Sequence, residues 1–181
     1  MRGLVFTEFL DFVEQAAGPE MVENMLDACD LESGGAYTSV GTYDHEEILK
    51  MLTFLNQATG QDVSEMVTAF GRNLFGQLVI THPAILQNGS TLLDFLERIE
   101  SHIHREVRKL YPDAELPYFE TERPDDRHLT MTYQSARPFV DLAHGMIMGA
   151  VDHFRNKVSI TRDALAIPGG FGARFQIAIV E

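Results

Sequence analysis

The segment RHLTMTYQSAR, residues 127–137, marks the point at which the periodicity of the chain changes from helical spacing to alternation. Met131 and Tyr133 alternate with polar residues, so they share one face of an extended strand. Two more alternating segments, KVSITRDALAI (157–167) and GARFQIAIVE (172–181), are joined by a Pro-Gly-Gly turn and predict a hairpin. We therefore expect a small antiparallel sheet late in the chain.

The half of the chain that precedes this segment has helical periodicity. Gly18 and Pro19 separate a first helix from a short second one, and a long helix is expected over residues 92–110. His82-Pro83 and Asn88-Gly89 interrupt the chain before the long helix. Three capping boxes are expected at helix starts, formed by Asp44 with Glu47, Asp62 with Glu65, and Thr91 with Asp94.

One further helix is expected between the first strand and the hairpin. The segment PFVDLAHGMIMGAVDHF, residues 138–154, returns to helical spacing, and Pro138 suits the first turn. The predicted fold class is α+β: a helical N-terminal half followed by a small antiparallel sheet with an inserted helix. Because the chain shows no repeat, linker or low-complexity tract, residues 1–181 are expected to form a single domain.

Length and charge exclude several classes of function. A chain of 181 residues and 20.3 kDa suits one compact domain, without room for a receptor plus a separate output module. Its formal net charge of -13 disfavours nucleic acid and membrane surfaces as partners. The single cysteine, Cys29, allows neither an internal disulfide nor a cysteine-based zinc site. With no signal peptide or membrane span evident, we expect a cytoplasmic protein.

The pattern Tyr133-x-Ser135-x-Arg137 is the most informative candidate site. Alternation along a strand places a phenol, a hydroxyl and a guanidinium on one face, where all three can donate hydrogen bonds to one anion. Such a grip beside an apolar wall suits a flat ligand with acidic tails. The alternative is structural: Tyr133 covers the core, Ser135 is incidental and Arg137 pairs with a surface acid. The pattern alone favours this alternative, because three residues on a strand often match by chance.

Two histidines in the long helix, His102 and His104, are candidate metal ligands. At about 100° per residue they point about 200° apart, on opposite edges of the apolar stripe of that helix. One metal ion cannot be held by both, but either could be an axial ligand to a cofactor. The alternative is that both are half-exposed boundary residues. Helical geometry does not choose between the two histidines.

Several of these motifs occur together in an order that resembles one family. The MRG start, the segment HREVRKLYP from His104, the later Leu-Pro and YQSAR resemble the heme-nitric oxide/oxygen binding (H-NOX) family over essentially the whole chain. That family includes the heme domain of soluble guanylate cyclase and stand-alone bacterial sensors. The resemblance implies that His104 is the proximal heme ligand and that Pro117 presses on the porphyrin. It also implies that Tyr133, Ser135 and Arg137 bind the propionates. The heme is expected to be b-type, because the chain has no C-x-x-C-H motif.

The resemblance also implies a distal wall and a choice of gas. Leu142 occupies the place of the distal tyrosine of oxygen-binding members, and Phe9 and Leu74 are expected to line the same wall. An apolar wall offers no hydrogen bond to bound oxygen, so we expect a sensor that binds nitric oxide, and also CO, at ferrous five-coordinate heme and excludes oxygen. The expected partner is a histidine kinase or a cyclic-di-GMP synthase or phosphodiesterase, regulated in trans.

Two other classes remain as alternatives. A heme enzyme such as a peroxidase would need a distal histidine or arginine, which the apolar distal positions do not supply, so we expect no enzymatic activity. A cofactor-free interaction module would use Arg137 to bind a carboxylate of a partner. The presence or absence of a heme absorption band distinguishes this module from a sensor.

Overall fold

The first half of the chain is helical, as its periodicity predicts. The computed structural model describes residues 1–86 and 89–180, so the turn expected at Asn88 lies outside the described residues. The helices of this half are α1 (Gly3–Ala17), α2 (Pro19–Ala28), α3 (Glu46–Thr59), α4 (Val63–Thr81) and the short 3-10 helix η1 (Pro83–Ile85). Gly18 separates α1 from α2 with a φ of 88°, a conformation that favours glycine.

The three expected capping boxes have different outcomes. Thr91 and Asp94 form the full reciprocal box. The Asp62 side chain accepts a hydrogen bond from the N–H of Glu65, which is the N-cap half of the expected box. The box at Asp44 is wrong, because the Glu47 side chain is buried and binds another part of the chain instead of the helix start.

The long helix expected over residues 92–110 is interrupted in its middle. It consists of α5 (Leu92–Arg98), a π-helical segment η2 (Ile99–His104) and α6 (Arg105–Leu110). A π-helix has more residues per turn than an α-helix, so a wheel drawn at 100° per residue misplaces the side chains in this segment. The predicted end is confirmed, but Leu110, expected on the apolar stripe, is 74% exposed.

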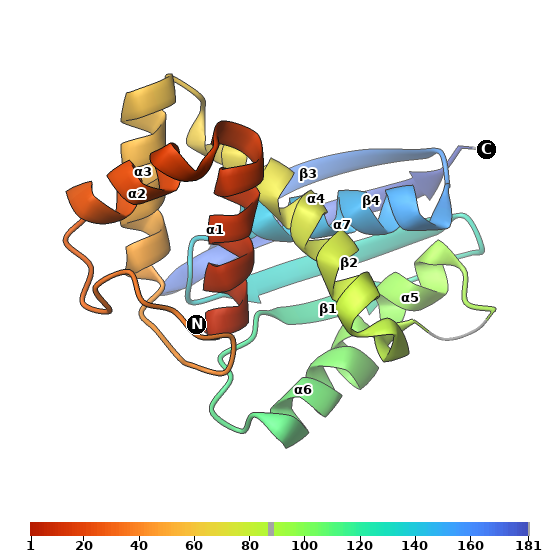
Figure 1. Cartoon of the computed structure of the whole chain (residues 1–181). Coiled ribbons are helices and arrows are strands. Elements are labelled where there is room, and N and C mark those ends of the chain that lie inside the picture. The colour runs from red at the N-terminus through yellow and green to blue at the C-terminus, as the bar shows by residue number, and fades with distance from the viewer. Residues whose placement is uncertain (87–88, 181) are drawn as a thin grey trace.

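The second half forms the expected sheet with its inserted helix. The elements are β1 (Tyr118–Glu122), β2 (His128–Ser135), α7 (Val140–Phe154), β3 (Val158–Ile167) and β4 (Gly170–Ile179). All neighbouring strands are antiparallel, in the order β1-β2-β4-β3. Strand β1 was not expected from the sequence; it pairs with β2 so that Phe119 lies opposite Tyr133. The α+β class is confirmed, and Figure 1 shows α1, α2 and α3 grouped toward one end of the sheet, with α4 crossing α7.

Two apolar clusters form the core. The sheet cluster joins β1, β2 and β4 to α5 and α7 and includes Met131, Tyr133 and Phe175. The helical cluster joins α1, α2, α3 and α4 and includes Phe9 and Leu74. Met146 on α7 packs against both clusters.

The crossing of α4 and α7 depends on glycines that let the two backbones approach closely. A Cβ added at Gly145 of α7 would lie 2.1 Å from the carbonyl oxygen of Thr68, and one added at Gly71 of α4 would lie 2.4 Å from that of Leu142. Any side chain larger than hydrogen would force the helices apart. Among the described residues, no helix combines the length and the hydropathy needed to cross a membrane.

Candidate functional site

His104 ends the π-helical segment and faces the sheet. Its side chain is 13% exposed, and its ring centroid lies 5.8 Å from that of Phe119 on β1. The Nδ1 atom lies 3.0 Å from the Oε2 atom of Glu100, one turn earlier. The same carboxylate accepts hydrogen bonds from Arg108 at 2.7 Å and from the backbone N–H of Phe119 at 3.3 Å. Glu100 therefore joins α6, η2 and β1 around the imidazole.

The surroundings keep the His104 imidazole neutral and orient it. Burial lowers the pKa of His104, although Glu100 and the backbone of Pro117 oppose that shift. Burial would raise the pKa of Glu100, but hydrogen bonds from Arg108 and His104 outweigh burial and lower it. An ionised Glu100 can only accept, so the Nδ1 atom of His104 donates and the Nε2 atom keeps its lone pair. This is the arrangement in which histidine binds a metal.

His102 has different surroundings. Its side chain is half-buried, and it interacts electrostatically with the exposed carboxylate of Glu106. Of the two histidines that helical geometry left open, the structure places His104 against the sheet beside a carboxylate that orients its ring.

Pro117 lies in the segment between α6 and β1, and its backbone carbonyl lies near enough to the His104 ring to oppose the fall in the pKa of His104. Two residues earlier, the backbone carbonyl of Glu115 accepts a hydrogen bond of 3.3 Å from Arg137, and the Glu115 carboxylate also pairs with that guanidinium. This segment therefore connects the candidate metal ligand to the candidate anion grip.

The structure brings Tyr133, Ser135 and Arg137 together, but not by strand alternation alone. Strand β2 ends at Ser135, and the backbone N–H of Arg137 then donates to the Ser135 Oγ atom at 3.0 Å. Tyr133 is 1% exposed, and burial raises its pKa while a hydrogen bond with Ser135 and the charge of Arg137 oppose the rise. Because Arg137 binds the carboxylate of Glu115, the guanidinium is accessible to a carboxylate in this position.

The expected distal residues lie in the helical cluster. Phe9 on α1 and Leu74 on α4 are buried, and Leu142 on α7 packs partly buried against the same cluster. The ring of Phe9 contacts that of Phe70 edge-on at 5.2 Å. The structure thus groups the three residues into one apolar region, separate from the sheet cluster in which Phe119 and Tyr133 lie.

Sequence reasoning missed three residues that position the site: Glu100, Glu115 and Phe119. A spacing of four residues from His104 on one helix could have identified Glu100. Phe119 lies in the short strand β1, whose alternation of five residues is a weak signal. Glu115 lies in irregular backbone, so no periodicity points to it.

Comparisons with known proteins find a matching family and similar solved structures. The family described as "Haem-NO-binding" matches residues 2–162. The Fe(II) unliganded H-NOX protein from K. algicida is 36% identical, with a TM-score of 0.92 over 100% of this chain and 97% of that one. The IWP-051-bound H-NOX from Shewanella woodyi, in its Fe(II)CO state, is 38% identical, with a TM-score of 0.84 over 99% of this chain and 95% of that one.

A more distant structure shares the fold. A mutant of the T. tengcongensis H-NOX is 20% identical, with a TM-score of 0.90 over 100% of this chain and 98% of that one. A search of curated proteins finds no match.

Proposed function

Because the chain belongs to the haem-NO-binding (H-NOX) family of heme-based gas-sensor domains, we propose that it senses nitric oxide and regulates a separate signalling protein. The family binds heme and gaseous ligands and acts with partner signalling proteins. The finer proposal is one domain, residues 1–181, that binds nitric oxide and CO at ferrous five-coordinate b-type heme, excludes oxygen and has no enzymatic activity.

The orientation of His104 is the observation that carries this proposal. A neutral imidazole whose Nδ1–H is held by Glu100 at 3.0 Å presents its Nε2 atom as a ligand. Heme, when bound, would supply the iron that takes the gas. We propose His104 as the single protein ligand of that iron.

Tyr133, Ser135 and Arg137 would hold the propionates of the heme. Their arrangement fits that role because the guanidinium already binds the Glu115 carboxylate, so a propionate can take the same donors. Pro117 would press on the porphyrin, and the nearness of its backbone to His104 supports that role.

The apolar distal residues support the exclusion of oxygen. Phe9, Leu74 and Leu142 carry no hydrogen-bond donor on their side chains, and bound oxygen needs a donor to stabilise its partial negative charge. Nitric oxide binds ferrous heme without that help. A distal histidine or arginine, which a peroxidase would need, is not supplied by these three positions.

The proposed signal is a change in the proximal helix. A change in how His104 is held would move η2 and α6, because Glu100 and His104 both contact Phe119 of the sheet. The surface offered to a partner would then change by a shift between two states. We propose a histidine kinase or a cyclic-di-GMP synthase or phosphodiesterase as this partner, acting in trans in the cytoplasm.

Absorption spectroscopy of the purified protein tests the sensor proposal. We expect a heme Soret band that shifts on addition of nitric oxide, and no stable oxygen complex when the ferrous protein meets air. A colourless protein after expression with adequate heme would instead favour a cofactor-free interaction module. A stable oxygen complex would refute the argument from the apolar wall.

A His104→Gly variant supplied with free imidazole tests the proposed signal. The variant should still bind nitric oxide, because imidazole replaces the ligand without its bond to the helix. It should no longer change the activity of the partner on ligation. Unchanged signalling would contradict the role of the proximal helix.

A further inference from the structure

The two edges of the sheet differ in whether their outward-pointing backbone groups have hydrogen-bond partners. At one edge, β1 has only five residues, and the N–H of Phe119 is taken by the Glu100 carboxylate. At the other edge, β3 has ten residues and, among the described strands, pairs with β4 alone. Alternate N–H and C=O groups of β3 point away from β4, and most of its side chains are exposed. A bare edge of this length can accept another strand.

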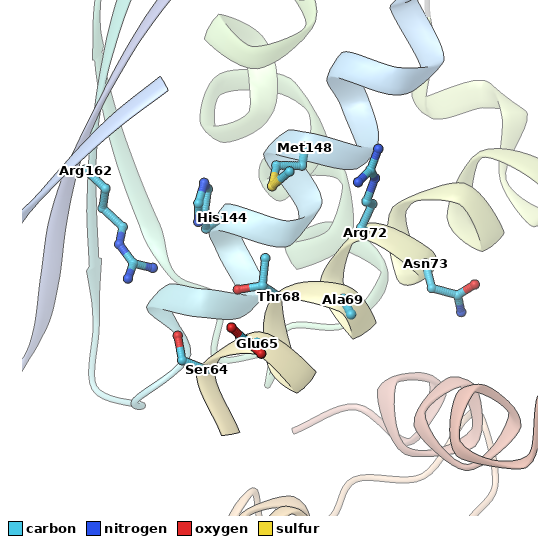
Figure 2. Close-up of a pocket in the computed structure, with 9 residues that line it drawn as sticks. All are labelled: Ser64, Glu65, Thr68, Ala69, Arg72, Asn73, His144, Met148 and Arg162. Carbon is cyan, nitrogen blue, oxygen red and sulfur yellow. The ribbon is translucent and has the colours of Figure 1, made fainter. Parts of the chain in front are cut away.

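A cleft of about 690 Å³ lies between α4, α7 and β3; Arg162 lines it from β3, and Glu65 lines it from α4. Figure 2 shows Arg162 of β3 and His144 of α7 facing the same space, with Thr68 and Arg72 of α4 on its far side. Arg162 also pairs with Asp141 on α7 through one terminal nitrogen, which shows that this face of β3 is turned toward α7. A guanidinium has five N–H donors, so Arg162 can bind a second carboxylate in the cleft.

A second hollow, of about 500 Å³, lies at the far end of β3. Its lining is apolar and includes Val140, Ala166 and Phe171, of which Phe171 is 44% exposed. Ala166 and Arg162 share one face of β3 because they are four residues apart. A strand added to this edge would therefore point one side chain into the cleft and another, four residues away, into the apolar hollow.

A second copy of the chain is a poor occupant of the β3 edge. Two-fold antiparallel pairing centred on the middle of β3 places Arg162 opposite Arg162 or Asp163 opposite Asp163, and like charges directly opposite are destabilising. Two copies also repel each other through a net charge of -13 each. The edge suits a different protein.

We propose that the β3 edge is a docking surface for an extended segment of the signalling partner. The segment adds as an antiparallel strand, with a glutamate or aspartate in the cleft at Arg162 and His144. An apolar residue four positions earlier enters the hollow at Ala166 and Phe171. The proposal rests on the proposed action on a partner in trans, but strand addition itself needs no change at the heme site.

A synthetic peptide tests this docking on the heme-loaded protein. The probe is a fluorescent decapeptide of alternating threonine and valine, with a leucine and a glutamate four positions apart on one face. Fluorescence anisotropy should show saturable binding, and hydrogen exchange should slow at alternate amides of β3. The peptide with leucine and glutamate exchanged should bind about tenfold more weakly, because antiparallel addition then puts each side chain in the wrong hollow.

Two controls separate strand addition from other binding. Alternate N–H groups of the extended peptide point to its two opposite edges. Two peptides are made, each N-methylated along one edge, and only the peptide methylated on the edge that pairs with β3 should lose binding. Arg162→Gln should weaken binding about tenfold, whereas Lys109→Gln, which removes one exposed positive charge on α6, should leave it unchanged. The proposal would be overturned if the unmodified peptide did not bind, or if a peptide N-methylated along both edges bound as tightly as the unmodified one. A dimer in sedimentation would overturn it in favour of a second copy.

The spectrum keeps this test separate from the proposed sensor function. If the Soret band responds to nitric oxide while the peptide fails to bind, the docking surface is wrong and the sensor stands. If the peptide binds to a protein whose Soret band does not respond to nitric oxide, the docking surface stands and the sensor proposal is wrong.

Discussion

The sheet cluster and the helical cluster carry different chemistry although both are apolar. The sheet cluster contains Tyr133 and Phe119, and polar residues border it: Glu100 and His104 contact Phe119, and Arg137 follows the end of β2. In the helical cluster Glu47 is buried, 4% exposed, and it is bound within its own region. The difference fits our proposal that one region binds the cofactor and the other sets the environment of the gas, so mutations in the two should have separable effects.

The largest expected effect separates two histidines of the same helical segment. His104→Ala should weaken heme binding by more than about 100-fold, because loss of a metal ligand exceeds the 10- to 100-fold effect of an outer-shell partner. His102→Ala is the matched control, because it removes a histidine from the same helical segment, and it should retain heme. Reconstitution monitored at the Soret band measures both. Equal heme loss in the two variants would remove His104 from its proposed role.

Glycine substitutions test the crossing of α4 and α7, which connects the two clusters. Gly145→Ala should lower the free energy of unfolding by about 2 kcal/mol, because the new methyl group meets the Thr68 carbonyl oxygen across the α4 and α7 crossing. Gly76→Ala on α4 has open space and should stabilise the protein by about 0.5–1 kcal/mol. Urea unfolding measures both. A neutral Gly145→Ala would mean that the helices can separate freely.

The proposed propionate-binding residues can be tested without changing the metal ligand His104. Arg137→Gln should speed heme dissociation about tenfold, because charged hydrogen bonds to a propionate are lost. Arg123→Gln removes a guanidinium that also pairs with carboxylates, those of Asp94 and Glu97, and should leave the dissociation rate unchanged. Transfer of heme to a globin acceptor gives the rates. An equal change in both variants would point to general destabilisation.

The smallest effect is confined to the helical cluster. Burial would raise the pKa of Glu47, but hydrogen bonds from Ser33 and Tyr37 outweigh it and lower the pKa. The stability that this carboxylate contributes is therefore present above its unfolded pKa, near 4.5, and is lost as pH falls through the lower folded value. Glu47→Gln should cost about 1 kcal/mol at pH 7 and flatten the acid limb of the stability curve.

Heme retention at neutral pH is the control for Glu47→Gln. The variant should bind heme normally, because Glu47 contacts Ser33 and Tyr37 in the helical region and none of the proposed cofactor residues. Heme loss without loss of stability would break the proposed division between the two clusters.

The amino-acid sequence by itself predicted most of the helices and strands and supplied the candidate site residues. Capping at Asp62 and at Thr91, the break at Gly18 and the alternation in β2 are local, so nearby residues specify them. The motif around His104 and the YQSAR segment pointed to the family, which the match over residues 2–162 confirms.

Only the tertiary structure decided how those residues meet. The π-helical turn that orients His104, the Glu100 contact with β1 and the turn that brings Arg137 back to Ser135 depend on packing between distant elements. The bare β3 edge likewise exists only once the strand order is known. The spacing of residues along the chain predicts which side chains share a face of one helix or strand. Whether side chains of different elements meet depends on long-range contacts that no single segment contains.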